Sequence, residues 1–385
     1  MKYISKTLTY LALTTLCACL LPSCSKHHKV LVEEQILLGA NSVSTKALVS
    51  GKQSLIDQCR ANGTGFGVYG YKVVGDYRFR VFDNVKVYPT TNSENTPWTY
   101  APTKYWDSNP QAYYQFVAYW PLVPNAAPES GDNYVTYVTE SNSVLTIHDI
   151  PNWQDSISAN DFMTDARRGY YRGQNDVVFS SGTVTFTFKH LLAKVVFKAC
   201  YTGVKGKEIK IHGLNLKPSD PQHMPMADGT IDCTRRFGGQ QEAEIAFTAP
   251  DSANLMDFSK TLFDSDEGVS LLDYYVESGS DPDSAKHICS WLTAPSINWN
   301  NLDVEVEYSV DGSSSTTGVA HGLTLNSTVT TTNPTSTTTY KHTTLSGYQY
   351  VVTLKLTAAN GIEIESVQVN DWIDGGTFTP FVYNW

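Results

Sequence analysis

The chain has 385 residues, of which 41% are hydrophobic and 17% are charged, and its formal net charge is −10. This length is typical of about two domains, and the apolar content excludes a wholly disordered chain. A net negative charge gives no electrostatic attraction for nucleic acid or anionic lipid, so the charge gives no reason to expect either as a partner.

The N-terminus has the pattern of a secretory signal. Lys2 and Lys6 come before an uncharged apolar run, residues 8–21, which is shorter than the roughly 20 residues that span a bilayer. The run ends in the letters LPSC, and the cysteine, Cys24, is typical of a bacterial lipoprotein signal. We expect residues 1–23 to be removed, Cys24 to carry the lipid, and the lipid to supply membrane contact. The alternative is an ordinary cleaved signal with a chance cysteine.

Besides Cys24, which is expected to carry the lipid, four cysteines remain in the mature chain: Cys59, Cys200, Cys233 and Cys289. They are widely scattered and form no C-x-x-C pair, which argues against a structural zinc site. Four cysteines allow three disulfide pairings. We favour buried thiols, because free cysteine packs as a small hydrophobic residue, and keep one disulfide as the alternative.

The first elements in chain order are a strand signal over 30–38 and a short helix over 53–60. Residues 65–71 then alternate glycine with bulky side chains at a period of two, which predicts a strand with glycines on one face. These glycines superficially resemble a phosphate-binding loop. Such loops follow a strand and open a helix, whereas these lie inside a strand pattern, so we reject that interpretation.

Short strand signals recur along the whole chain, separated by Asn, Pro, Gly and Ser. They cover 79–82, 85–88, 113–120, 134–138, 208–216, 242–247, 288–292, 303–310, 348–356 and 362–369. This spacing predicts an all-β sandwich protein. We expect a boundary near residues 180–182, which gives an N-terminal domain over 24–180 and a C-terminal domain over 181–385.

Two segments admit more than one interpretation. Residues 190–199 would also line a helix face, but the alternation before them and the β-branched pair Val195-Val196 favour a strand. Residues 313–344 are rich in Ser and Thr. We favour an exposed hairpin with its flanking loop over a glycosylated or adhesive loop.

No enzyme signature is present: the chain contains no G-x-S-x-G, H-E-x-x-H or P-loop pattern. We therefore expect no catalytic residues, no metal and no cofactor. His27 and His28 are expected to be solvated, and His190 to be a partly buried strand residue that makes one hydrogen bond. The scattered acids are expected to face water; they are Asp155, Asp161, Asp165, Glu363 and Glu365.

Residues 98–120 form a dense aromatic block. Aromatic faces stack on sugar rings, so Trp98 and Trp106 are candidates for glycan stacking. We favour the interpretation that these aromatics fill a sandwich core, because residues 114–119 alternate as a half-buried strand would. The alternative function is a surface glycan-binding lipoprotein.

Several segments together resemble one known family. They are TKA at 45–47, KYW at 104–106, YQFVAYWP at 114–121, DFMTDA at 161–166, VTFTFKHLLAKV at 184–195 and VNDW at 369–372. In this order they are similar to the motifs of the fimbrillin family, the subunits of type V pili. Lys46 stands where the family pattern has arginine.

The resemblance implies two transthyretin-like β-sandwich domains in tandem. It also implies that the subunit passes through the periplasm to the outer membrane as a lipoprotein, where a trypsin-like protease removes the N-terminus with the first strand. A neighbouring subunit then fills the vacated groove with a strand of its own. In this chain the removable strand is residues 30–40, and the cleavage point is Lys46 or Arg60.

The same resemblance implies a role as a structural, tip or anchor subunit, with other pilus subunits as partners. Surface glycans or proteins of a host or of other bacteria are further candidate partners. The donor strand is residues 376–385, although this segment equally fits a last strand paired within its own domain. A subunit that is never cut keeps its lipid and acts as a membrane anchor.

Overall fold

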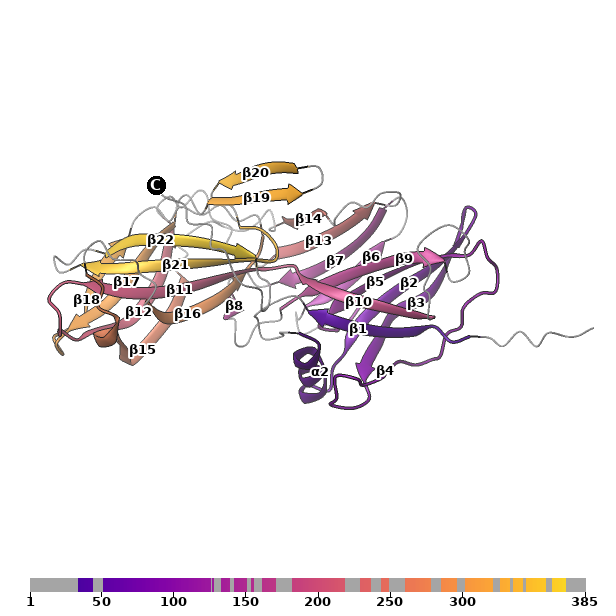
Figure 1. Ribbon diagram of the computed structural model, residues 1–385, viewed down its shortest axis with the longest axis horizontal. Coiled ribbons are helices and arrows are strands. Elements are labelled where there is room, and N and C mark those ends of the chain that lie inside the picture. The colour runs from indigo at the N-terminus through magenta and orange to yellow at the C-terminus, as the bar shows by residue number, and fades with distance from the viewer. Residues whose placement is uncertain are drawn as a thin grey trace, which may run out of the picture. The chain divides into compact units, whose positions relative to one another are not determined.

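The computed structural model is built almost entirely of β-strands, with one α-helix and one short 3₁₀ turn in its described part (Figure 1). It describes residues 34–43, 51–125, 127, 133–138, 142–150, 154–155, 161–170, 182–218, 229–236, 244–248, 260–277, 285–295, 302–320, 326–332, 335–341, 344–357 and 362–371. The all-β prediction is confirmed.

A seven-stranded sheet has the order β1-β10-β9-β5-β2-β3-β4. Its strands are β1 (Leu37–Val43), β2 (Phe66–Val74), β3 (Tyr77–Pro89), β4 (Trp98–Thr99), β5 (Tyr113–Trp120), β9 (Met163–Tyr170) and β10 (Thr183–His190). Neighbouring strands run antiparallel except β1, which runs parallel to β10. The first described strand therefore occupies one end of this sheet.

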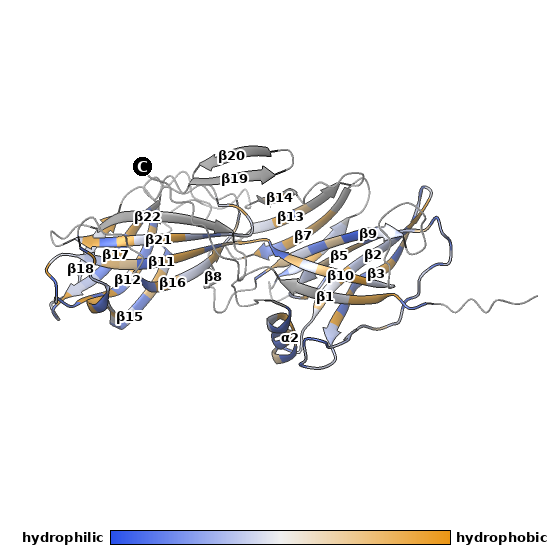
Figure 2. Ribbon diagram, viewed as in Figure 1, coloured by the Kyte–Doolittle hydropathy of each residue, from blue (hydrophilic) through white to orange (hydrophobic). Residues whose placement is uncertain are grey.

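The strand β5 shows how the sheet is covered on both faces. Tyr114 and Phe116 belong to the core on one face, and Val117 and Tyr119 belong to a second core on the other. All four are at most 5% exposed. We expected a half-buried strand here, and that expectation is wrong because a second sheet covers the other face. Figure 2 shows hydrophobic and hydrophilic segments following one another along the strands.

The glycines of β2 are explained by packing. A Cβ on Gly67 would lie 2.6 Å from Cζ of Tyr119, and one on Gly70 would lie 2.8 Å from Cδ2 of Phe82. Separations under 3 Å between such atoms are not tolerated, so larger residues at either position would displace a buried ring. The strand prediction for 65–71 is confirmed, but the glycines do not share one face. Gly67 faces Tyr119 of the second core, and Gly70 faces Phe82 of the first.

The helix α2 (Gly51–Ala61) confirms the predicted helix over 53–60. It buries Leu55 and Cys59 in the same core as β1. Its C-terminus is a Schellman motif: Gly63 has a φ of +61°, Gly63 N–H donates to the Arg60 carbonyl, and Thr64 N–H donates to the Cys59 carbonyl. Glycine at this position ends the helix without the strain that a side chain would cause.

A four-stranded sheet, β14-β13-β7-β6, supplies the second core of the first pair of sheets. Its strands are β6 (Tyr134–Val138), β7 (Asn142–Ile150), β13 (Gly229–Arg236) and β14 (Glu244–Thr248). Val135, Leu145 and Ile231 of this sheet cluster with Tyr69 and Tyr119 of the seven-stranded sheet. Side chains from both sheets thus fill the space between them.

A second pair of sheets encloses its own core. One sheet has the order β22-β21-β11-β16-β8 and the other β15-β12-β17-β18. The elements are β8 (Gln154–Asp155), β11 (Ala193–Thr202), β12 (Ile209–Pro218), β15 (Lys260–Ser270), η1 (Leu272–Tyr274), β16 (Lys286–Thr293), β17 (Leu302–Val310), β18 (Thr316–Ala320), β21 (Tyr348–Thr357) and β22 (Ile362–Asp371). Alternate residues of β11, β12, β17 and β21 meet in one cluster.

The sheets divide the chain differently from the expected boundary at residue 180. The strand β10, which follows it, pairs with β1 and β9 of the first pair of sheets, and β13 pairs with β7. The chain passes from the first pair of sheets to the second between β10 and β11 and returns to the first pair for β13 and β14. The short strand β8, which precedes β10, already belongs to the second pair. The contested segment 190–199 is not helical: a bend at residues 191–192 joins the end of β10 to β11, so the favoured strand is confirmed from Ala193 on. The sequence contains no local signal for which sheet each strand joins.

The Ser/Thr-rich segment contains the antiparallel hairpin of β19 (Asn326–Thr332) and β20 (Thr335–Lys341). The predicted hairpin is confirmed. Within the described residues, no helix is long and apolar enough to cross a membrane.

Candidate functional site

The strand β1 lies in a slot that has two walls. On one side it pairs with β10, from Leu37 opposite Thr183 to Val43 opposite Phe188 (Figure 1). On the other side Gln35 forms an antiparallel bridge with Tyr105. A strand added at a sheet edge normally pairs with one neighbouring strand. Here a second segment contacts it as well, which restricts the polypeptide segments that fit the slot.

From Ile36, which directly precedes β1, the side chains alternate between core and surface. Ile36, Leu38 and Ala40 are 0%, 4% and 2% exposed, whereas Leu37 is 44% exposed. The three buried side chains join the cluster that also holds the aromatic rings of β5 and β10. Full burial of one Ile or Leu side chain is worth about 1.5–3 kcal/mol. Thus β1 fills a substantial part of this core although it lies at one end of the sheet.

Hydrogen bonds fix the start of β1. Ile36 N–H donates to the Lys104 carbonyl at 2.9 Å, and the Tyr100 hydroxyl donates to the Ile36 carbonyl at 2.6 Å. On the opposite side Leu37 N–H donates to the Gly182 carbonyl at 3.1 Å. Burial raises the pKa of Tyr100, so its hydroxyl stays protonated and remains a donor at neutral pH.

The arrangement can bind an extended segment of polypeptide. Without β1, the edge of β10 would carry unpaired N–H and C=O groups, and the cluster would lose three buried side chains. A foreign strand restores both the main-chain hydrogen bonds and the side-chain burial when it adds to such an edge. The segment 98–106, which forms the second wall, was predicted only as part of an aromatic core.

The expected removable strand, residues 30–40, overlaps β1 over Leu37–Ala40; residues 30–33 lie outside the described part of the chain. Of the two predicted cleavage points, Lys46 lies outside the described part. Arg60 is exposed in the last turn of α2, where its Nη1 donates to the Thr90 carbonyl at 3.1 Å. Cys24 and residues 376–385 also lie outside the described part.

The aromatic block is mainly core, as favoured. Trp106 is 5% exposed, its Nε1–H donates to the Gly182 carbonyl at 3.1 Å, and its ring meets Tyr114 edge-on at 4.7 Å. Trp98 is partly buried, with its ring centroid 5.2 Å from that of Phe66. Because a stacked sugar needs an open ring face, Trp106 is not a candidate for glycan stacking in this conformation.

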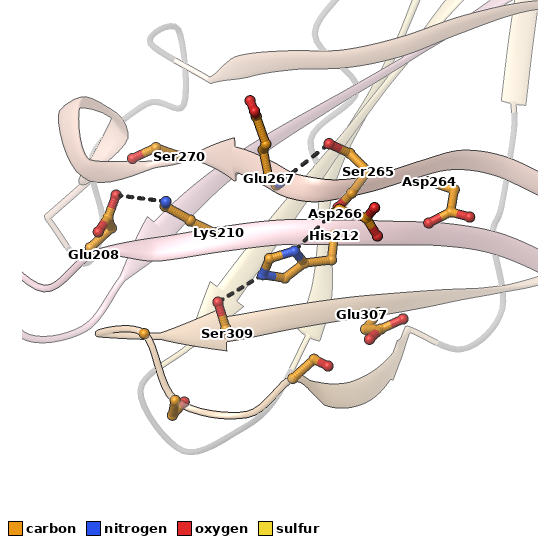
Figure 3. Close-up of a pocket in the computed structure, with 14 residues that line it drawn as sticks. Glu208, Lys210, His212, Asp264, Ser265, Asp266, Glu267, Ser270, Glu307 and Ser309 are labelled. Atoms are coloured by element: carbon orange, nitrogen blue, oxygen red, sulfur yellow. Dashed lines mark hydrogen bonds and ion pairs between the residues drawn. The ribbon is translucent and has the colours of Figure 1, made fainter.

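A polar groove lies on β12, β15 and β17 and has a volume of about 880 Å³ (Figure 3). Its carboxylates are Glu208, Asp264, Asp266, Glu267 and Glu307. The charge of Glu208 is partly offset by Lys210, whose Nζ lies 3.7 Å from Oε1. Among the described residues, no group of three or more His, Cys, Asp or Glu could hold a metal ion.

His212 crosses this groove and contacts both neighbouring strands. Its Nε2 lies 2.8 Å from Oγ of Ser309, and its Nδ1 lies 3.2 Å from the Ser265 carbonyl (Figure 3). A histidine beside a serine is the pattern of a nucleophilic dyad, but Ser309 is only 6% exposed and Nδ1 faces a neutral carbonyl. His212 lies at a β-bulge in the pairing of β12 with both β15 and β17. Its side-chain contacts therefore connect the three strands where the backbone register shifts.

A buried acid–imidazole pair lies where the chain leaves the first pair of sheets. Oδ1 of Asp161 is 2.6 Å from Nδ1 of His190, and both side chains are 1% exposed. Ser346 Oγ donates to the His190 carbonyl at 2.8 Å. The expectation that the acids face water is therefore wrong for Asp161, and His190 is more deeply buried than expected. Burial lowers the pKa of the neighbouring Lys194, against the opposing effect of the Asp161 charge.

The cysteines agree with the favoured prediction. Cys59, Cys200, Cys233 and Cys289 are thiols in the described structure, and the first three are buried. Burial raises the pKa of the Cys59 thiol to about 11. A thiol with so high a pKa is a poor nucleophile at neutral pH.

Comparisons with known proteins agree with this architecture. A family described as fimbrillin-like matches residues 49–266, which is more than half of the chain. The chain is similar in structure to a fimbrial protein from Bacteroides vulgatus, with 15% identity, a TM-score of 0.51, and coverage of 88% of this chain and 99% of that one. It is also similar to the fimbrial anchor protein Mfa2 from Porphyromonas gingivalis, with 7% identity, a TM-score of 0.31, and coverage of 89% and 98%. No curated protein matches the chain.

The likeness to the Bacteroides vulgatus protein, at 15% identity and a TM-score of 0.51, supports the fold alone, and the family match supplies the relationship. Both agree with the all-β sheets described above and with the motifs found in the sequence. The chain therefore belongs to the fimbrillin-like family of pilus- and adhesin-type structural proteins.

Proposed function

We propose that this protein is a subunit of a type V pilus that reaches the outer membrane as a lipoprotein and joins its neighbours by strand exchange. Family membership supports the pilus role. The observation that carries the exchange step is the place of β1: it ends a sheet, its three alternate side chains fill a core, and it is the first strand described in the chain.

The proposed sequence of events starts with export. The signal over residues 1–23 directs the chain out of the cytoplasm, and acyl chains on Cys24 hold it at the membrane. While the chain is intact, β1 is tethered to its own slot. A cut between β1 and α2 removes that covalent connection. A strand from another subunit then competes with β1 for the slot without the disadvantage of facing a tethered competitor.

Lys46 is the better of the two cleavage points. It falls between the end of β1 at Val43 and the start of α2 at Gly51, so a cut there frees β1 and leaves the helix in place. The Arg60 carbonyl accepts a hydrogen bond from Gly63 N–H inside the Schellman motif. Proteases bind extended substrates, so cutting after Arg60 requires the last turn of α2 to unfold. Unfolding of this turn would also disrupt the packing of Leu55 and Cys59 in the core.

The donor strand in this proposal is residues 376–385 of a neighbouring copy. Support comes from β22, which pairs only with β21 in the described sheet and is followed by the last residues of the chain. A chain that leaves from a sheet edge can extend to a neighbour without breaking its own core. A copy that escapes cleavage keeps its lipid and β1, and serves as the anchor.

Two variants test the proposal, with the mature N-terminus from cell envelopes measured by mass spectrometry. We expect acylated Cys24 in the uncut precursor and a chain that begins at Ala47 in the pilus. Lys46→Gln should abolish that cut and the ladders on denaturing gels, while Arg60→Gln should leave both intact. Pili built from chains that begin at Ala61, or cut chains that remain monomers under all conditions, would contradict the proposal.

Glycan binding remains the second hypothesis for this chain, and the burial of Trp106 removes one of its two stacking residues. Pilus assembly is favoured because it uses the slot around β1, for which glycan binding offers no role.

A further inference from the structure

The second wall of the slot contains an unused hydrogen-bond donor. Nε1 of Trp98, on β4, is buried and has no acceptor among the described residues. Burial of an indole N–H without an acceptor is costly, because the group loses its hydrogen bond to water. The same ring packs against Phe66 with a centroid distance of 5.2 Å, which holds its plane in place.

The residue of β1 that faces this ring is Gly39. A Cβ on Gly39 would lie 3.6 Å from Cδ1 of Trp98, which is ordinary van der Waals contact. The φ of Gly39 is outside the left-handed region, so the backbone does not require glycine there. The slot thus has room for a small side chain beside the indole, and β1 leaves that room empty.

We propose that the slot is matched to a strand with a small hydroxyl residue, serine or threonine, in the place of Gly39, and that the occupant is residues 376–385 of a second copy of this chain. This inference rests on the proposed strand exchange. A hydroxyl oxygen one bond beyond Cβ can accept from Trp98 Nε1, since Cδ1 and Nε1 are bonded neighbours in the indole. The exchanged strand gains a hydrogen bond that β1 never makes, which gives the exchange its direction.

The sequence of the donor fits this requirement. Residues 376–385 read GTFTPFVYNW, so Phe378 has a threonine on each side. If Phe378 takes the buried place of Leu38, a threonine takes the place of Gly39 whether the donor runs parallel or antiparallel to β10. The flanking residues are Thr377 and Thr379.

A binding experiment tests the inference directly. The full chain is cut after Lys46, β1 is removed, and a labelled peptide of residues 376–385 is titrated into it. A second peptide carries Thr377→Val and Thr379→Val, which keep the shape and remove the hydroxyls. We expect the valine peptide to bind about tenfold more weakly, which corresponds to about 1.4 kcal/mol.

The matched control removes the donor instead of the acceptor. In Trp98→Phe the ring against Phe66 is kept and the N–H is lost, so the two peptides should bind within about twofold of each other. Equal affinities for the unchanged protein, or the same tenfold loss in Trp98→Phe, would overturn the inference.

A second measurement follows the release of β1 after cleavage and needs no peptide. In the intact chain, Gly39→Ser supplies the missing hydroxyl on β1 itself, so β1 should leave the slot more slowly after a cut and block the donor longer. Leu37→Ser, at an exposed position of the same strand, is the control. A release rate for Gly39→Ser at or above that of Leu37→Ser would contradict the inference.

The experiment also separates this inference from the function on which it rests. A peptide of β1 itself, residues 34–43, must rebind the cut chain if the slot accepts strands at all. Failure of both the β1 peptide and the donor peptide would refute strand exchange. Binding of both without any effect of the threonines or Trp98 would refute only the hydroxyl match.

Discussion

Removal of the Leu38 side chain should destabilise the precursor and have no effect on the assembled pilus. Leu38 is 4% exposed within the core that β1 completes. Leu→Ala at such a site costs about 2–5 kcal/mol, from lost burial and the cavity left behind. Since whole domains are stable by only about 5–15 kcal/mol, Leu38→Ala should remove a large part of the stability of the first pair of sheets.

The assay is urea unfolding, monitored by tryptophan fluorescence. It uses a chain that starts at Ser25 and so retains β1. Trp98 approaches β1 closely enough that a Cβ on Gly39 would touch its ring, so it reports on the slot. The free energy of unfolding comes from linear extrapolation of the first transition. The same measurement on cut and polymerised subunits should show no difference between Leu38→Ala and the unchanged chain, because the altered strand is gone.

Leu37→Ala is the control, because the side chain of Leu37 is 44% exposed and its loss should change stability by less than about 0.5 kcal/mol. Equal effects of the two variants on the precursor would refute the assignment of Leu38 to the core. An equal loss in the precursor and in the polymer would mean that β1 stays in the pilus, which refutes strand exchange.

Three further results are expected from the core. Asp161→Asn weakens the 2.6 Å contact with His190 and should cost about 1–3 kcal/mol in chemical unfolding, and a double-mutant cycle with His190→Phe should show the two effects to be non-additive. Gly67→Ala places a carbon 2.6 Å from the Tyr119 ring and should cost about 1–3 kcal/mol; an unchanged melting temperature would refute the close approach. Burial raises the pKa of Cys59 from 9.0 to about 11, so the unfolded state loses its proton first as pH rises. The Cys59 contribution to stability is complete below about pH 9 and falls by about 1.4 kcal/mol per pH unit toward pH 11, so Cys59→Ala should make the loss of stability over that range smaller by this amount.

Much of the local structure followed from the sequence. The predicted strands over 113–120 and 134–138 coincide with β5 and β6, and the helix over 53–60 lies within α2. These predictions succeeded because side-chain periodicity and turn residues act over a few positions. The resemblance to the fimbrillin family was confirmed because its motifs also lie in local segments.

The candidate site was only partly predictable. The sequence marked the first strand as the exchanged element, but it contained no signal that β1 would pair parallel with β10 or that residues 98–106 would form a second wall. It also placed Asp161 at the surface, whereas the structure pairs it with His190 in the interior. Each of these contacts joins residues far apart in the chain, so no local pattern encodes it.

The sequence by itself determined that this is a β-protein and predicted its export, because a period of two and an apolar leader can each be recognised within one segment. Only the tertiary structure decided which strand pairs with the edge of each sheet. The choice depends on long-range packing, as in the fit of Gly39 beside Trp98, where two segments meet only after the sheet has formed.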